Sequence, residues 1–171
     1  MGSEMCIRDR VLSDLLHFGG NRIDESIITY VKRTYNLVIG QKTAQALKEK
    51  LGSGIPGNTE TMVIVGRDVV SGLPIEMEIT GEVVYEAIKD NLNSICNSIK
   101  MILEKTPPEL AADVADRGIV LTGGGALLRG LEELIEDRTG INTMTADDPM
   151  TCVAIGTGKY VEFLSGKRDD D

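Results

Sequence analysis

The amino-acid sequence predicts a mixed α/β fold, and three observations lead to that prediction. Apolar residues recur at helical spacing in several segments, whereas other segments are rich in Val and Ile and are typical of strands. The two kinds of segment alternate along the chain, which indicates interleaved helices and strands. The 171 residues are 42% hydrophobic and 26% charged, so the chain can bury a core in one or two domains.

Two helices are predicted at the start of the orderly sequence. Residues 21–37 place Ile and Val at helical spacing, and either Asn21 or Asp24 can cap that helix. Asp24 and the glutamate that follows it suit the positive end of the helix dipole, so their simplest role is capping. Residues 40–52 predict the second helix, which we expect to stop at Gly52.

A hairpin and a long helix come next. Residues 60–80 predict two strands around a turn at Ser71 and Gly72. Residues 81–106 carry the strongest helical pattern of the chain, and we expect this helix to pack against the sheet. Its apolar residues form one continuous stripe: Val84, Ile88, Leu92, Ile95, Ile99 and Ile102.

The last third of the chain alternates between helices and strands. Its predicted elements are a helix, a strand, a second helix, a second strand and a closing helix, over residues 108–117, 118–122, 126–140, 141–149 and 150–164. The strand segment Ile119–Thr122 offers only apolar residues and Thr. We therefore expect that strand to be central and covered on both faces.

Charge and residue usage exclude several classes of protein. The net charge of −9 argues against a nucleic-acid surface, which requires fields of Lys and Arg. No apolar run approaches the length of a membrane span. The cysteines, Cys6, Cys96 and Cys152, are widely spaced and expected to be reduced, and His17 is the only histidine. A Ser-His-Asp or Cys-His mechanism and a metal cage are therefore not expected.

The ends of the chain are set apart from the fold. The first ten residues, MGSEMCIRDR, do not resemble native protein sequence and are expected to be an artificial leader. Residues 164–171 are expected to form a charged, frayed tail.

The stretch GIVLTGGGALLRG, residues 118–130, is the clearest candidate for a binding site. Leu131 and Glu132 follow it where a phosphate-binding Walker loop has Lys and Ser or Thr, and its consecutive glycines do not match a dinucleotide-binding fingerprint. A strand, a turn without side chains and a helix start expose backbone N–H groups to phosphate or ribose oxygens. A tight connection without a ligand remains an alternative.

Lys48 lies one helical turn after Gln45, so both side chains share a face of the second helix. An amide and an ammonium on one face can hold a ribose hydroxyl and a ring nitrogen. A solvated helix face is the alternative interpretation.

Several segments resemble the MreB family of bacterial actin-like proteins. They come in the order in which the family has them and cover residues 19–163: GGNRIDESIITYVKRTYNLVIGQKTAQALK, GRDVVSGLPIEMEI, TPPELAADVADRGIVLTGGGALLRGLEEL and DDPMTCVAIGTGKYVE.

The resemblance implies that residues 11–163 form the second half of an actin-like ATPase with a ribonuclease-H-like core. Residues 24–80 would be a smaller inserted α/β subdomain, and residues 81–163 would be the core subdomain. The family's two phosphate loops and its water-positioning residues are expected in the half that this sequence lacks. No catalytic residue is therefore expected here, and ATP hydrolysis by this chain stays open.

The resemblance also implies the site residues. The loop on the adenosine side of ATP would be formed by Thr122, Gly123, Gly124 and Gly125, and the helix that brackets ribose and adenine by Gln45, Ala46, Leu47 and Lys48. The Mg²⁺ that accompanies ATP would be held mainly by the missing half. Gln45 replaces a glutamate that the family usually has, as Gln41 does, and Asn21 replaces an aspartate. An uncharged glutamine makes a weaker hydrogen bond to a ribose hydroxyl.

The function implied is that of an ATP-binding, filament-forming cytoskeletal protein that determines rod shape and organises cell-wall synthesis. It would be cytoplasmic, membrane-associated as a polymer, and would bind copies of itself and the cell-wall elongation machinery at the inner membrane. Another actin-fold ATPase, such as a chaperone or sugar kinase, is one alternative, and an inactive truncated nucleotide-binding module is another. Tyr35 and Glu82 are too close in sequence for a large inserted substrate domain, which disfavours the first alternative.

Overall fold

The computed structural model describes residues 12 and 19–164. The expected leader, His17 and nearly all of the expected tail lie outside these residues. The elements, in chain order, are α2 (Gly20–Tyr35), β1 (Leu37–Val38), α3 (Gln41–Leu51), β2 (Thr61–Asp68), β3 (Pro74–Thr80), α4 (Gly81–Lys105), α5 (Pro108–Arg117), β4 (Ile119–Leu121), the 3₁₀ helix η1 (Gly124–Leu127), α6 (Leu131–Thr139), β5 (Thr143–Thr145) and α7 (Cys152–Leu164).

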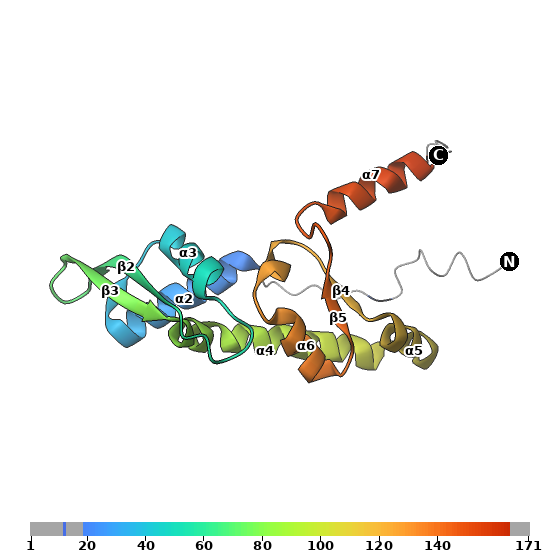
Figure 1. Ribbon diagram of the computed structural model, residues 1–171, viewed down its shortest axis with the longest axis horizontal. Helices are drawn as coiled ribbons and strands as arrows, with labels where there is room; N and C mark the ends of the chain where they lie inside the picture. Colours follow the sequence, from blue (N-terminus) through green and yellow to red (C-terminus); the bar gives the residue numbers. More distant parts are fainter. Residues whose placement is uncertain (1–11, 13–18, 165–171) are drawn as a thin grey trace.

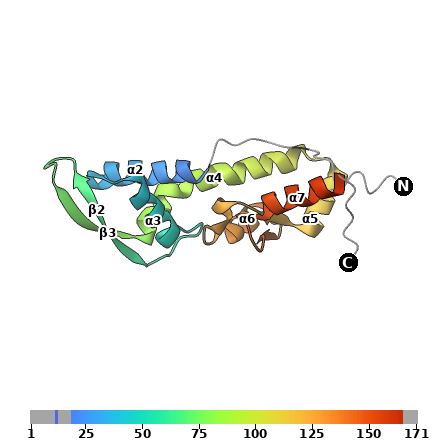
Figure 2. The ribbon, with the colours of Figure 1, turned by 90° about the horizontal axis from the view of Figure 1, so that it is seen from above.

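The molecule is elongated, and α4 runs along its length (Figures 1 and 2). The β2–β3 hairpin lies at one end of this axis and α5 lies at the other, while α7 projects away from the rest (Figure 1). Of the helices that the structure describes, none combines the length and the apolar character that crossing a bilayer requires.

The first sheet is antiparallel and has the order β1-β2-β3. The hairpin confirms the two predicted strands, and its alternation buries Ile64 and Ile79 while the side chains of Val63 and Val65 point outward. Strand β1 was missed, because the sequence places Leu37 within a helix. Asn36 ends α2 in the left-handed conformation, which asparagine tolerates better than most residues.

One apolar core joins α2, α3, the first sheet, α4 and α6. Its fully buried members from α4 are Val84, Ile88, Leu92 and Cys96, which recur every four residues along one face. The predicted stripe is therefore correct for its first half, whereas its later members, Ile95, Ile99 and Ile102, are only half-buried. The remaining fully buried apolar residues of this core are Ile23, Ile27, Val31, Leu37, Ile39, Ala44, Leu47, Leu51, Ile64, Ile79, Leu131 and Ile135.

The second sheet is a parallel pair of short strands, β4 and β5. Ile119 and Leu121 pack against the core, but the outward pair, Val120 and Met144, is 57% and 43% exposed. The expectation that strand 119–122 is covered on both faces is therefore wrong. Helix α7, which follows β5 in the chain, projects away and leaves this outer face open (Figure 1).

The helix predicted to start at residue 126 begins only at Leu131. Between the glycine turn and α6 lie η1 and a segment that pairs with the loop after α3. Arg129 forms a parallel bridge with Ser53, and its carbonyl accepts a hydrogen bond of 2.6 Å from the Gly54 N–H. A Cβ on Gly54 would lie 2.6 Å from the Gly130 carbonyl oxygen, so only glycine permits this approach. This long-range pairing keeps the segment out of the helix.

Candidate functional site

A hollow of about 430 Å³ lies where the start of α2, one face of α3 and the glycine turn meet. Its walls come from segments far apart in the sequence. The lining residues are Gly20, Ile23, Gln45, Lys48, Glu49, Gly52, Gly124, Gly125, Leu127, Leu128, Arg129 and Met150.

Four of the eight residues predicted for the site line this hollow. Gln45 and Lys48 come from α3, and Gly124 and Gly125 come from the glycine turn. The two segments are separated by more than seventy residues of sequence, so the fold alone brings them together.

The other four predicted residues do not line this hollow. Thr122 lines a neighbouring, mainly apolar hollow of about 290 Å³, which shares Gly20, Ile23, Gly125 and Leu128 with the first. Leu47 is fully buried in the core, so its side chain supports α3 and cannot touch a ligand in either hollow. Ala46 is half-buried and lines neither hollow. Gly123 has a φ of +84° and donates its N–H to the Pro149 carbonyl, so it shapes the turn.

The ammonium of Lys48 is held against a buried carboxylate. Its Nζ lies 2.8 Å from Asp24 Oδ1 and 3.3 Å from the carbonyl oxygen of Gly20. Asp24 is only 3% exposed, and α2 has Gly19 at its N-cap position without a side-chain cap. The expected capping role of Asp24 is therefore wrong, and Lys48 is not on a simply solvated face.

Gly124 forms the opposite wall of the hollow. A Cβ on this residue would lie 3.1 Å from Met150 Sδ, so a larger side chain would compete with Met150 for the same space. Met150 itself is 65% exposed and, with Leu127, presents an apolar surface to the hollow. The prediction that a long helix begins at the turn is wrong, because η1 has only four residues and α6 starts later.

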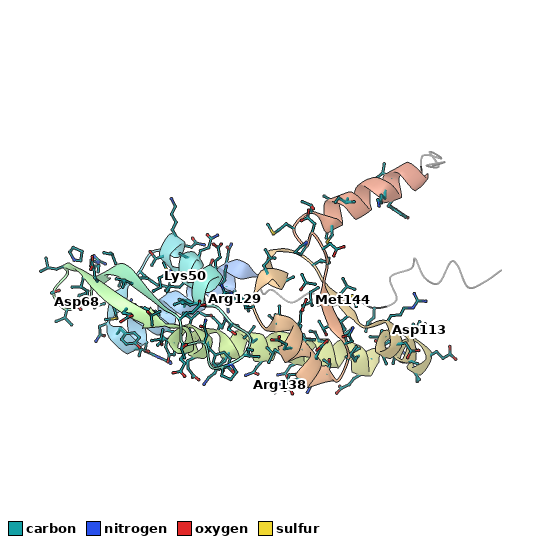
Figure 3. The ribbon with its side chains drawn as sticks, viewed as in Figure 1. Lys50, Asp68, Asp113, Arg129, Arg138 and Met144 are labelled. Atoms are coloured by element: carbon teal, nitrogen blue, oxygen red, sulfur yellow. The ribbon has the colours of Figure 1, made fainter. Side chains whose placement is uncertain are left out.

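Polar side chains ring the hollow. The Gln45 Nε2 donates to Glu49 Oε1 at 2.9 Å, and the Arg129 guanidinium lies 3.3 Å from Glu60 Oε2 in an exposed pair. Figure 3 shows Arg129 beside α3, whereas Asp68 lies at the far tip of the hairpin.

Groups with a displaced pKa lie outside the hollow. Burial raises the pKa of the Cys96 thiol in α4, and a hydrogen bond from the Ser71 hydroxyl lowers the pKa of Asp68. A hydrogen bond to Glu86 raises the pKa of Lys89. Within residues 19–164, no group of three His, Cys, Asp or Glu side chains is arranged to hold a metal ion. The hollow therefore offers hydrogen-bond donors and an apolar wall, which are features of a binding site.

Sequence reasoning missed several lining residues, for two different reasons. Glu49 and Gly52 stand four residues after Gln45 and Lys48, so helical spacing could have placed them on the same face. Leu128 and Arg129 had no local signal, because their position follows from the pairing of the segments around Ser53 and Arg129. Met150 had none either, because its segment reaches the glycine turn through the hydrogen bond from the Gly123 N–H to the Pro149 carbonyl oxygen. Elsewhere, a separate hollow of about 540 Å³ lies between α2 and α4 and is lined mostly by charged and polar residues.

With this geometry established, comparison with known proteins gives the family. A sequence model described as "MreB/Mbl protein" matches residues 5–168. This chain belongs to the MreB/Mbl family. It is 43% identical over 157 residues to the cell shape-determining protein Mbl of Bacillus cereus, covering 91% of this chain and 47% of that protein. It is also 43% identical over 155 residues to the cell shape-determining protein MreB of Escherichia coli, covering 90% and 45% respectively. The chain thus spans about half the length of the curated relatives it matches.

Solved structures confirm the actin-like α/β fold of the family. MreB5 of Spiroplasma citri bound to AMPPNP superposes with a TM-score of 0.88 and 37% identity over 92% of this chain and 47% of that one. The same protein bound to ADP superposes with a TM-score of 0.89 and 36% identity, over 95% of this chain and 50% of that one. A chain of a MamK double helical filament superposes with a TM-score of 0.71 and 27% identity, over 86% of this chain and 45% of that one. The resemblance to the MreB family and the predicted fold class are therefore confirmed.

Proposed function

We propose that this chain is the adenosine-binding half of a filament-forming MreB/Mbl cytoskeletal protein that determines cell shape. The observation that carries the proposal is the hollow in which Lys48 and Gln45 face Gly124 and Gly125. The likeness to MreB5 structures bound to AMPPNP and ADP supports a nucleotide as its ligand. The family match favours this function over a chaperone or a sugar kinase.

Each wall of the hollow has a role in this proposal. The Gln45 amide can accept from one ribose hydroxyl, and the Lys48 ammonium can donate to the other ribose hydroxyl or to a ring nitrogen. Gly124 leaves space for the nucleoside, and Met150 and Leu127 provide an apolar surface for the flat face of the base. The predicted roles of Ala46, Leu47, Thr122 and Gly123 become indirect ones, in support of α3 and of the turn.

Binding by this chain is expected to be weak. Gln45 lacks the charge that strengthens a hydrogen bond, and the hollow is open to water, which weakens electrostatic contacts. The described residues do not provide a cluster suited to Mg²⁺, so the metal and the phosphates are not assigned to this hollow. We expect a dissociation constant no tighter than the high-micromolar range, or about 5–6 kcal/mol of binding free energy.

Assembly is the second part of the proposal. Actin-like filaments stack protomers head to tail through contacts that do not close on themselves. We place part of the longitudinal contact on the hairpin tip, residues 67–74, and on the loop of residues 54–59. Val70 and Leu73 at this tip are 84% and 63% exposed. The likeness to a MamK filament supports self-assembly. Regular filaments of the purified chain in electron micrographs would contradict our expectation that this half alone forms none.

The cellular setting completes the proposal. The polymer would be cytoplasmic and associated with the membrane, where it would organise the cell-wall elongation machinery. The names of the relatives, cell shape-determining proteins, support this role. The subdomain division at residue 80 also stays part of the proposal.

Titration of ATP by calorimetry tests the nucleotide site directly. Gly124→Val should abolish binding, because a branched side chain would occupy the space beside Met150. Gly158→Val is the matched control, since Gly158 lies in α7 with no atoms near its Cβ position. Submicromolar binding, or ATP hydrolysis that survives Gly124→Val, would show that the nucleotide site lies elsewhere.

A further inference from the structure

The carboxylate of Asp24 is buried in α2 without an aligned hydrogen-bond partner for its Oδ1 atom. The Lys48 ammonium lies 2.8 Å from that oxygen, so the two form a close charge pair whose geometry is not that of a hydrogen bond. A buried charge is costly unless an opposite charge compensates it. Lys48 thus supplies the opposite charge that offsets the cost of burying the Asp24 carboxylate.

The same ammonium reaches the hollow. The Lys48 side chain is 19% exposed, against 4% for that of Asp24, and Lys48 lines the hollow whereas Asp24 does not. An ammonium has three N–H donors. The Gly20 carbonyl oxygen accepts from one of them, and Asp24 Oδ1 lies beside the ammonium without an aligned hydrogen bond, which leaves a donor for an oxygen atom in the hollow.

Gly20 makes this arrangement possible at the N-terminus of α2. A Cβ on Gly20 would lie 3.2 Å from Lys48 Nζ, which is closer than most Cβ contacts. A side chain at this position would therefore require the ammonium to shift by a few tenths of an ångström from its place beside the carboxylate. Gly20 and Asp24 of α2 therefore hold the ammonium of Lys48, which belongs to α3, at the edge of the hollow.

We infer that Asp24 is a positioning residue of the adenosine site, which holds the Lys48 ammonium so that one of its free N–H groups donates to a ribose hydroxyl. This inference rests on the proposed function. A lysine side chain that is already ordered loses little conformational freedom when the ligand binds, so its hydrogen bond contributes more to affinity. The competing interpretation is a structural tie between α2 and α3 that has no effect on the ligand.

The test compares ATP with 2′,3′-dideoxy-ATP, which lacks both ribose hydroxyls, by ligand-observed NMR titration of the whole chain. Wild type should prefer ATP by about tenfold, the value of one well-placed hydrogen bond to a charged group. Asp24→Asn and Lys48→Met should each reduce this preference to the part that the Gln45 amide supplies, and the double variant should reduce it no further than either single variant.

The matched control is Glu25→Gln, an exposed acid-to-amide change at the next position of α2, outside the hollow. It alters the net charge as Asp24→Asn does and should keep the tenfold preference. Melting temperatures of all variants, from circular dichroism, separate a loss of ligand preference from a loss of stability.

The outcomes are distinct. If Asp24→Asn melts earlier but keeps the preference for ATP, Asp24 is a structural tie and the inference is wrong, while the proposed function stands. If wild type binds neither nucleotide, the proposed function fails and the inference fails with it. Should Asp24→Asn not fold, Asp24→Glu keeps the charge but displaces the ammonium, and an undiminished preference in that variant would overturn the inference.

Discussion

Two regions of this protein are packed to very different degrees. The packed body, made of α2, α3, the first sheet, α4 and α6, contributes fifteen of the sixteen residues of the buried apolar core, and the sixteenth, Ile39, lies in the connection between β1 and α3. The open region, made of α5, β4, η1, β5 and α7, contributes none of them. Val153 and Tyr160 in α7 are 64% and 56% exposed, and α5 has no buried residue.

This difference in packing indicates which part of the candidate site is already ordered before a ligand binds. Parallel strands are normally covered on both faces, and the β4–β5 pair is covered on one. The hollow lies at the boundary between the two regions. Lys48 stands on a helix anchored in the core, whereas Gly124 and Met150 belong to the loosely covered side. We therefore expect the lysine wall to be rigid and the glycine wall to be adjustable.

Aspartate substitutions should give the largest contrast between the regions. Ile88→Asp places a charge at a fully buried position of α4 and should lower the free energy of unfolding by about 3–5 kcal/mol. Ile95→Asp, at a half-buried position, should cost about 1–3 kcal/mol, and Val120→Asp on the open face about 1 kcal/mol or less. Urea unfolding followed by circular dichroism measures all three. Equal costs for Ile88 and Val120 would mean that the open face is buried in solution.

Thiol labelling should reveal the same contrast in dynamics. Cys96 is 2% exposed and burial raises its pKa, so it should react only when the core opens. Cys152, at the start of α7, is partly exposed and should react at least about a hundredfold faster at pH 8. Mass spectrometry of a Cys6→Ser background follows each site separately. Equal rates would show that the body opens as readily as the open region.

The exposed pair on the second sheet should govern self-association more than stability. Replacing Val120 and Met144 together by Thr keeps strand-compatible side chains but removes most of the apolar surface of this face. The unfolding free energy should change by about 0.5 kcal/mol or less, while light scattering at high concentration should fall. Val63→Thr is the comparison on the outward face of the first sheet. A large loss of stability in the double variant would contradict an open face.

The smallest effect is expected at the hairpin tip. Ser71 donates from its hydroxyl at 2.6 Å and its backbone N–H at 2.9 Å to Asp68 Oδ2, which lowers the pKa of Asp68 below its ordinary 3.8. A depressed pKa stabilises the folded state above about pH 4, and this contribution disappears as the pH falls through the folded-state value. Asp68→Asn should therefore melt slightly below wild type at pH 7. The gap should narrow as the pH falls below 3.8; a gap that stays unchanged over the whole acidic range in which both proteins remain folded would show that charge is not the cause.

Local patterns predicted most elements of the packed body. The four-residue spacing of Val84, Ile88 and Leu92 predicted α4, and Ser71 with Gly72 predicted the hairpin turn. These signals are reliable because a helix face or a tight turn depends on residues close together in sequence. The same reasoning placed Gln45 and Lys48 on one face of α3, and both line the hollow.

The tertiary structure decided the features that depend on distant partners. Strand β1 exists because it pairs with β2, and the start of α6 is delayed because Arg129 pairs with Ser53. Asp24 seemed a helix cap in sequence, but its environment is set by Lys48, twenty-four residues later. The sequence by itself determined the family, the helical faces and the glycine turn. Burial, charge pairing and the meeting of α3 with that turn were decided only in three dimensions, because desolvation depends on everything that surrounds a group.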